Sequence, residues 1–125
     1  MNRANRRAAI LRAIENRSGD PNLSAAAVAK LLGITPRYVH LLVADTGRSF
    51  TRHLLERRLE RAALMLRDSR WEQRKIADIA VEAGFTDLSY FNRAFRRSFG
   101  LTPTEMRDQA RQPQGLVKAG TPPGP

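Results

Sequence analysis

The chain carries one pattern twice, as Val-Ala-Lys-Leu-Leu-Gly-Ile-Thr at residues 28–35 and as Ile-Ala-Val-Glu-Ala-Gly-Phe-Thr at residues 79–86. In both copies a β-branched residue and Ala are followed, after three residues, by Gly, an apolar residue and Thr. A helix-turn-helix unit needs this order, because the small Ala lets a second helix cross the first closely and Gly suits a turn with positive φ. One copy alone is common in helical hairpins, but two copies predict tandem helix-turn-helix units.

Helical spacing continues on both sides of the two copies, and no segment alternates apolar and polar residues as a strand does. Ser24 and Thr35 are predicted N-caps, with Pro36 in the first turn after Thr35. The longest predicted helix, at residues 50–66, would span about 25 Å at about 1.5 Å per residue. Helices are expected at residues 9–17, 25–32, 36–45, 50–66, 76–83 and 87–98, with a last helical turn after Thr102-Pro103.

The predicted fold class is all-α, with two helix-turn-helix lobes joined by a long connecting helix and about seven helices in total. The first lobe covers about residues 8–48, the connecting helix residues 50–66 and the second lobe residues 71–108. After these the composition changes, since four of the seven prolines lie near the C-terminus. We therefore expect a structured domain at residues 1–109 and a disordered tail rich in Pro and Gly at residues 110–125.

The charge of the chain indicates a polyanionic partner. Its 125 residues include 22 Lys and Arg against 12 Asp and Glu, which gives a net charge of +10. A phosphate neutralised by such a chain releases condensed counterions, and Arg, which greatly outnumbers Lys, suits both phosphate and guanine. Duplex DNA, RNA and an anionic membrane surface all fit this charge.

Several other function classes lack the residues that they need. The chain has no Cys, and its two histidines, His40 and His53, have no partner ligands, so we expect no metal site. No nucleophile–base set and no phosphate loop is present, so we expect neither an enzyme nor a cofactor. No apolar run reaches the length of a membrane span and no signal-type apolar core follows the basic N-terminus. We therefore expect a cytoplasmic protein without a membrane partner.

The phenylalanines of the second lobe are predicted to form core. Phe91, Phe95 and Phe99 recur on one helix face, which favours packing over a stacking platform for single-stranded nucleic acid. Arg93 stands midway between the first two rings, so it points away from the core that they define. After the shared Thr the second copy carries one extra residue, which makes Leu41 the counterpart of Arg93 in the first lobe.

The second copy resembles the signature of the AraC/XylS family of transcription regulators over residues 84–103 (Gly-Phe-Thr-Asp-Leu-Ser-Tyr-Phe-Asn-Arg-Ala-Phe-Arg-Arg-Ser-Phe-Gly-Leu-Thr-Pro). The match continues at residues 76–80 (Ile-Ala-Asp-Ile-Ala) and 105–107 (Glu-Met-Arg). Residues 58–62 (Arg-Leu-Glu-Arg-Ala) are similar to the family's connecting helix, and residues 35–39 (Thr-Pro-Arg-Tyr-Val) to its first recognition helix. The resemblance covers roughly residues 8–108 and is more specific in its second half.

The resemblance implies a sequence-specific regulator that binds double-stranded DNA as a monomer, without a cofactor, and acts beside RNA polymerase. Two recognition helices would enter successive major grooves, which repeat about every 34 Å on one face of DNA. By resemblance, Arg93 is the base-reading residue of the second lobe. The other residues that the resemblance implies are Leu88, Ser89 and Asn92 as groove neighbours, Arg96 and Arg97 as contacts to the DNA backbone, and Arg37 and His40 as groove-facing positions of the first lobe.

The first lobe departs from the family pattern, which commonly has Arg at the position of Leu41 and an aromatic residue at that of Val43. An alternative function is therefore a protein-interaction module, whose first lobe docks RNA polymerase or a partner regulator while the second lobe holds DNA loosely. A general basic binder of RNA or membranes is a third alternative, which the turn chemistry disfavours. Many family members carry an effector-binding or dimerisation domain before this part, so the chain is either a short member or a fragment.

Overall fold

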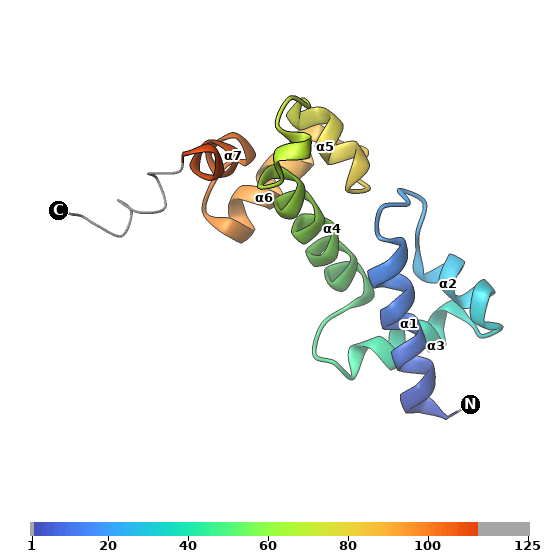
Figure 1. The fold of residues 1–125 in the computed structure, drawn as a ribbon. Helices are drawn as coiled ribbons and strands as arrows, with labels where there is room; N and C mark the ends of the chain where they lie inside the picture. The colour runs from blue at the N-terminus through green and yellow to red at the C-terminus, as the bar shows by residue number, and fades with distance from the viewer. Residues whose placement is uncertain (1, 113–125) are drawn as a thin grey trace. The chain divides into compact units, whose positions relative to one another are not determined.

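The computed structural model describes residues 2–112, and these form seven α-helices, one short 3₁₀ helix and no strand (Figure 1). In chain order they are α1 (Arg3–Arg17), α2 (Ala25–Leu32), α3 (Pro36–Ala44), α4 (Phe50–Leu66), the 3₁₀ helix η1 (Ser69–Trp71), α5 (Ile76–Glu82), α6 (Leu88–Phe99) and α7 (Pro103–Arg111). The predicted all-α class is confirmed. The chain divides into unit 1 (Met1–Arg58) and unit 2 (Leu59–Pro125), and the boundary falls inside α4.

Two helices are longer than predicted. α1 begins at Arg3, because the side chain of Asn2 caps it by accepting a hydrogen bond from the N–H of Asn5 at 2.8 Å. α7 continues through Arg111, whose Nη2 donates to the carbonyl oxygen of Glu72 at 2.7 Å. Residues 110 and 111 therefore belong to a helix and not to the predicted tail. The rest of that prediction, from residue 113 on, lies outside the described residues.

The repeated sequence forms the same turn in both units. Gly33 ends α2 with φ of 70°, and Gly84 follows α5 with φ of 107°. Both values lie in the left-handed region, where a residue with a Cβ is strained. The predicted role of the two glycines is confirmed.

The hydrogen bonds of the two turns also correspond. In unit 1 the N–H of Ile34 donates to the carbonyl oxygen of Ala29 at 3.0 Å, and in unit 2 the N–H of Phe85 donates to that of Ala80 at 2.9 Å. Each bond satisfies a carbonyl at the end of a helix and reverses the chain tightly. The sequence repeat is therefore a repeat of backbone geometry as well.

The helices after the two turns are capped by different residues. Thr35 caps α3 by accepting a hydrogen bond from the N–H of Tyr38 at 3.1 Å. Asp87 caps α6 in the same way, with 3.0 Å to the N–H of Tyr90. The extra residue of the second copy thus lies between the turn and the cap, and from there on the two helices are in register.

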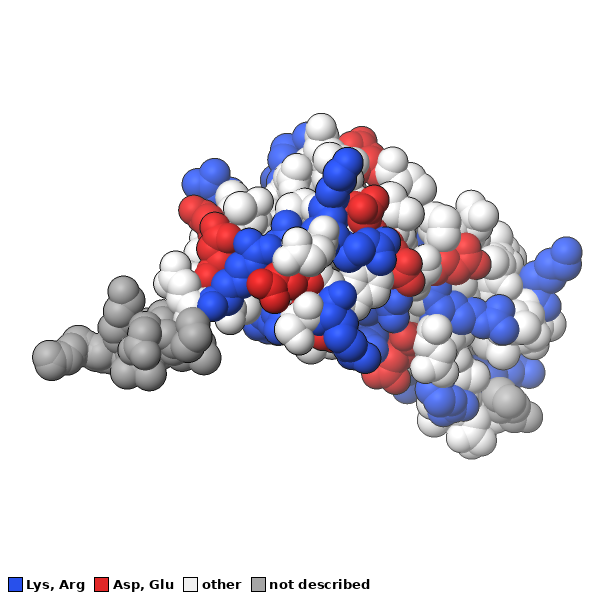
Figure 2. Space-filling model, turned by 45° about the horizontal axis from the view of Figure 1, so that its top comes forward, with Lys and Arg blue, Asp and Glu red and all other residues white. Residues whose placement is uncertain are grey.

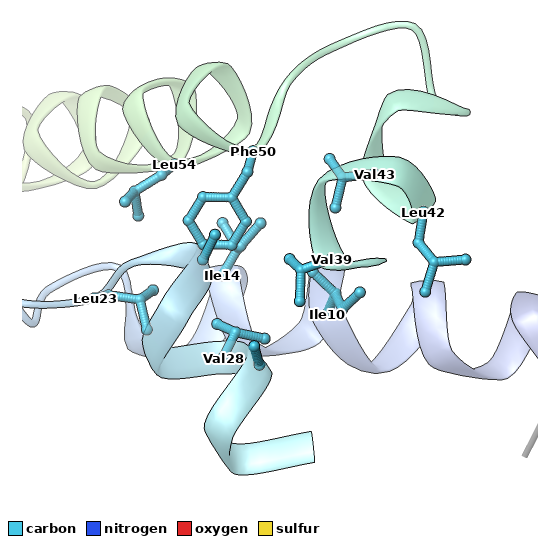
Figure 3. Close-up of a cluster of buried hydrophobic side chains, with 11 residues drawn as sticks. Ile10, Ile14, Leu23, Val28, Val39, Leu42, Val43, Phe50 and Leu54 are labelled. Carbon is cyan, nitrogen blue, oxygen red and sulfur yellow. The ribbon is translucent and has the colours of Figure 1, made fainter. Parts of the chain in front are cut away.

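Unit 1 has a core to which four helices contribute, and Figure 3 shows Phe50 reaching from α4 toward side chains of α1 and α3. Val39 and Val43, four residues apart, are both fully buried and fix which face of α3 stays exposed. Burial of such a side chain contributes about 1.5–3 kcal/mol. The buried residues are Ile10, Ile14, Leu23, Ala25, Val28, Ala29, Val39, Leu42, Val43, Phe50 and Leu54.

The core of unit 2 contains a chain of aromatic rings. The ring centroids of Phe85 and Phe91 lie 4.8 Å apart, those of Phe91 and Phe95 5.6 Å, and those of Phe95 and Phe99 4.7 Å. The first three rings are buried and the fourth is half-buried. These distances are typical of packed aromatic pairs, so the rings form core and are not open to stack on bases.

The C-terminus of α1 is capped by a side chain from α4. Arg58 donates from Nε to the carbonyl oxygen of Ser18 and from Nη2 to that of Asp20, both at 2.8 Å. Carbonyl groups at a helix end have no donor within the helix, and Ser18 is fully buried. The guanidinium of Arg58 therefore has a structural role in unit 1.

An ion-pair cluster joins the start of α1 to the end of α3. The carboxylate of Asp45, the C-cap of α3, lies 3.1 Å from Nη2 of Arg3 and 2.8 Å from Nη2 of Arg7. Arg7 also donates from Nε to the carbonyl oxygen of Leu42 at 3.0 Å. The hydrogen bond from Arg3, followed by that from Arg7, holds the pKa of Asp45 below its usual range.

The substitution Gly33→Ala should destabilise the protein by about 1–2 kcal/mol, because an L-residue is strained in the left-handed region. No heavy atom lies within 4 Å of the position that the new Cβ would take, so φ alone sets the cost. Gly33→Asn should cost less, since Asn enters this region more readily. Urea denaturation followed by circular dichroism measures both losses, and equal losses would contradict a cost set by φ.

The substitution Asp45→Asn should lower the free energy of unfolding at neutral pH but not in acid. Because the pKa of this carboxyl is lower in the folded than in the unfolded protein, its contribution is present above about pH 4 and is lost as the pH falls through the folded-state pKa. Urea denaturation of both proteins from about pH 7 to about pH 2 measures the difference, with the exposed Glu15→Gln as control. A difference independent of pH would argue against the ion pairs.

Candidate nucleic-acid interface

Helix α6 has one buried face and one exposed, basic face. Phe91, Ala94 and Phe95 are buried, and Gly100 ends the helix with φ of 76°. At about 100° per residue, Arg93 lies on the opposite side of the helix from the two buried rings. All the α6 residues that the sequence predicted for DNA binding are exposed: Leu88, Ser89, Asn92, Arg93, Arg96 and Arg97.

The guanidinium groups of the three α6 arginines form no hydrogen bond and no ion pair with residues 2–112. Several other arginines of unit 2 are bound to groups within the unit. Arg70 pairs with Asp68, Arg107 donates to the carbonyl oxygen of Arg74, and Arg111 donates to that of Glu72. The guanidinium groups of α6 therefore keep their donors available for an external acceptor.

Glu105, an acidic residue whose carboxylate feels the charge of Arg96, is occupied by a helix cap. Glu105 and Thr102 form a capping box at the start of α7, in which Glu105 accepts from the N–H of Thr102 at 2.8 Å and its own N–H donates to the Thr102 hydroxyl at 3.1 Å. The bond from the backbone N–H of Thr102, followed by that from its side chain and a smaller effect from the charge of Arg96, holds the pKa of Glu105 below its usual range. The carboxylate is thus ionised without forming a hydrogen-bonded pair with the α6 arginines.

Helix α3 exposes a face of different character. Arg37 and His40, the residues predicted for the first lobe, are both exposed, and the rings of His40 and Phe50 form a T-shaped pair with centroids 6.3 Å apart. Leu41 is 50% exposed. At the positions that correspond to the three arginines of α6, α3 carries Leu41, Ala44 and Asp45. The cations of this face are therefore fewer than on α6.

Two features of these surfaces were not predicted from the sequence. Tyr90 is 42% exposed on α6 and precedes Arg93 by three residues, so the two share a face. The helical period of α6 puts Tyr90 on the same face as Arg93, so this residue could have been predicted from the sequence. The other feature is the cluster of Arg3 and Arg7 on Asp45, which no local pattern signals, because the partners are far apart in the chain.

One face of the molecule has mixed charge. On the face drawn in Figure 2, Lys and Arg side chains are interspersed with Asp and Glu. Within residues 2–112 no group of three or more His, Asp or Glu side chains is placed to hold a metal ion. In the same range no single helix is long and apolar enough to cross a membrane, although α2 and α3, bent by 105°, meet the length and composition test as a pair.

The chain is similar in sequence to a known helix-turn-helix family and to transcription regulators. A family model described as a helix-turn-helix domain matches residues 28–109. The transcriptional activator RhrA of Rhizobium meliloti is 38% identical over 104 residues, which are 82% of this chain and 32% of that protein. The uncharacterized transcriptional regulatory protein YesN of Bacillus subtilis is 35% identical over 114 residues, 89% of this chain and 29% of that protein. The chain thus spans about a third of the length of these relatives.

Solved structures share the fold. The C-terminal domain of AraT, a response regulator from Geobacillus stearothermophilus, matches with a TM-score of 0.75 and 26% identity, over 83% of this chain and 84% of that one. A transcriptional regulator from Chromobacterium violaceum, described as one of the AraC-type DNA-binding domain-containing proteins, matches with a TM-score of 0.74 and 26% identity, over 88% of this chain and 96% of that one. With its two helix-turn-helix units and the match over residues 28–109, the chain belongs to the AraC-type helix-turn-helix family, which consists of DNA-binding transcription regulators and not of enzymes.

Proposed function

We propose that this regulator recognises a specific duplex site by placing α3 and α6 in successive major grooves of one DNA face. The observation that carries the proposal is the unpaired arginine face of α6, on a helix whose other face is locked into the core of unit 2. A locked helix presents its side chains at fixed positions, as base reading requires. Family membership supports duplex DNA as the ligand.

On α6 the exposed residues divide into two roles. Arg93 reads a base, because a guanidinium forks onto O6 and N7 of guanine, with Leu88, Ser89 and Asn92 as its neighbours in the groove. Arg96 and Arg97 bind phosphates, which fixes the register of the helix on DNA. On α3, Arg37 and His40 face the groove, whereas Leu41 has no donor and can contact only an apolar group such as the methyl of thymine.

One chain is sufficient for one site in this proposal, because it carries two recognition helices. The protein acts in the cytoplasm and, like the relatives named as transcriptional activators, raises transcription from a position beside RNA polymerase. A second candidate function is favoured by the exposure of Leu31 (54%) and Leu41 (50%) in unit 1. In this second function the first unit docks RNA polymerase or a partner regulator, and the second unit alone binds DNA.

Arg93→Ala should relax base preference at one position of the site, with a loss of discrimination of about 1–3 kcal/mol. Leu41→Ala should change base preference far less, because leucine cannot select guanine. Arg96→Ala should weaken binding to all sequences alike, since a phosphate contact carries no sequence information. Selection of a binding site from random duplexes, followed by titration of each variant against single-base changes, measures these effects. Equal loss of preference in Arg93→Ala and Leu41→Ala would refute the assigned reader.

Binding should be steeply dependent on salt and should need one chain per site. If about six to eight phosphates are neutralised, the slope of log K against log salt should lie near −5 to −7. Sedimentation of the complex should show one chain on about two turns of DNA. A slope shallower than about −2 would favour the docking function, and a strict need for two chains would exclude the monomer.

A further inference from the structure

Three arginines at the start of α1 lie along one flank of α3. Arg3 and Arg7 bind the carboxylate of Asp45 at 3.1 and 2.8 Å, and the guanidinium carbon of Arg6 lies 5.7 Å from the ring centroid of Tyr38. Both partners belong to the C-cap and first turn of the helix that we propose for the first groove. We call the three residues Arg3, Arg6 and Arg7 the α1 arginine edge.

This edge is cationic after its internal contacts are counted. Two guanidiniums share the single carboxylate of Asp45, and the third, that of Arg6, lies over the Tyr38 ring, which leaves its charge unneutralised. Arg3 uses one nitrogen on Asp45, and its side chain is 59% exposed. Since a guanidinium has five N–H donors, one that already holds a carboxylate still has donors for a second acceptor.

The edge occupies the place that α6 fills with its own side chains. Asp45 of α3 corresponds in register to Arg97 of α6, and Tyr38 corresponds to Tyr90. In unit 2 the cation at this place is part of the helix itself. In unit 1 the helix carries an acid there, which would repel a phosphate, and α1 covers that acid with two arginines.

We propose that the α1 arginine edge is a phosphate-binding site of the first unit, where Asp45 anchors two of its guanidiniums beside the DNA backbone that flanks α3. The inference rests on the proposed function and adds residues to it. It assigns to α1 the contacts to the DNA backbone that α3 lacks. A purely structural clamp between α1 and α3 is the competing explanation for the same ion pairs.

The test is the salt dependence of duplex affinity in the full chain. For each phosphate that the protein no longer neutralises, the slope of log K against log salt becomes shallower by about 0.9, so replacing all three arginines of the edge by Gln should change it by about 2.7. The variant in which the three are replaced by Lys keeps the charge and should keep the wild-type slope. Arg12→Gln is the matched control, since Arg12 is exposed on α1 about 180° around the helix from Arg3.

If the Gln triple variant loses helix content, the single variant Arg3→Gln tests the proposal instead, because Arg3 lies in the exposed first turn of α1. Arg3→Gln should make the slope of log K against log salt shallower by about 0.9. An unchanged slope together with a lower melting temperature would show a structural clamp and overturn the proposal. A slope change as large in Arg12→Gln would also overturn it, because the effect would then follow net charge. If the wild-type chain fails to bind duplex DNA, or Arg96→Ala leaves its affinity intact, the proposed function fails instead.

Discussion

The left-handed turn at Gly33 and Gly84 is the constraint on which both units depend. It ends one helix, satisfies a carbonyl at that end and starts the next helix after only two or three residues. Because Ala29 and Ala80 are buried and small, the second helix can lie close across the first. The inward side chains of α3 and α6 then meet a core, and the helical period directs the remaining positions outward.

Within this common frame the two units distribute charge differently. α6 concentrates its unpaired arginines on the face opposite its buried rings, whereas the corresponding face of α3 has Leu41, Ala44 and Asp45. A base-reading helix needs donors in the groove and cations at its edges, and these two requirements can be met by different elements. In unit 1 the cations lie on α1, as the phosphate-binding site proposed for that unit requires.

Arginine serves two purposes in this chain, and the difference lies in its surroundings. Arg58, Arg107 and Arg111 donate to backbone carbonyl oxygens and so stabilise helix ends and connecting segments. Arg93 has no such acceptor within the described residues and remains available to a ligand. The net charge of +10 therefore overstates the number of cations that are free to meet phosphate. A guanidinium bound to a carbonyl still contributes charge, but it has fewer donors and a fixed position.

The sequence by itself determined the all-α class, the two turns, their register and the outward direction of Arg93. These follow from short-range rules, since a helical period and a Gly at a turn are read within about ten residues. Only the tertiary structure decided which arginines are held by partners distant in the chain. The contacts of Arg3 and Arg7 with Asp45, and of Arg58 with Ser18, join residues about 40 positions apart, and charge pairing over such separations leaves no local pattern. The candidate site of the second unit was therefore visible in the sequence, because one helix holds all of it. The basic edge of the first unit appeared only when the fold brought α1 and α3 together.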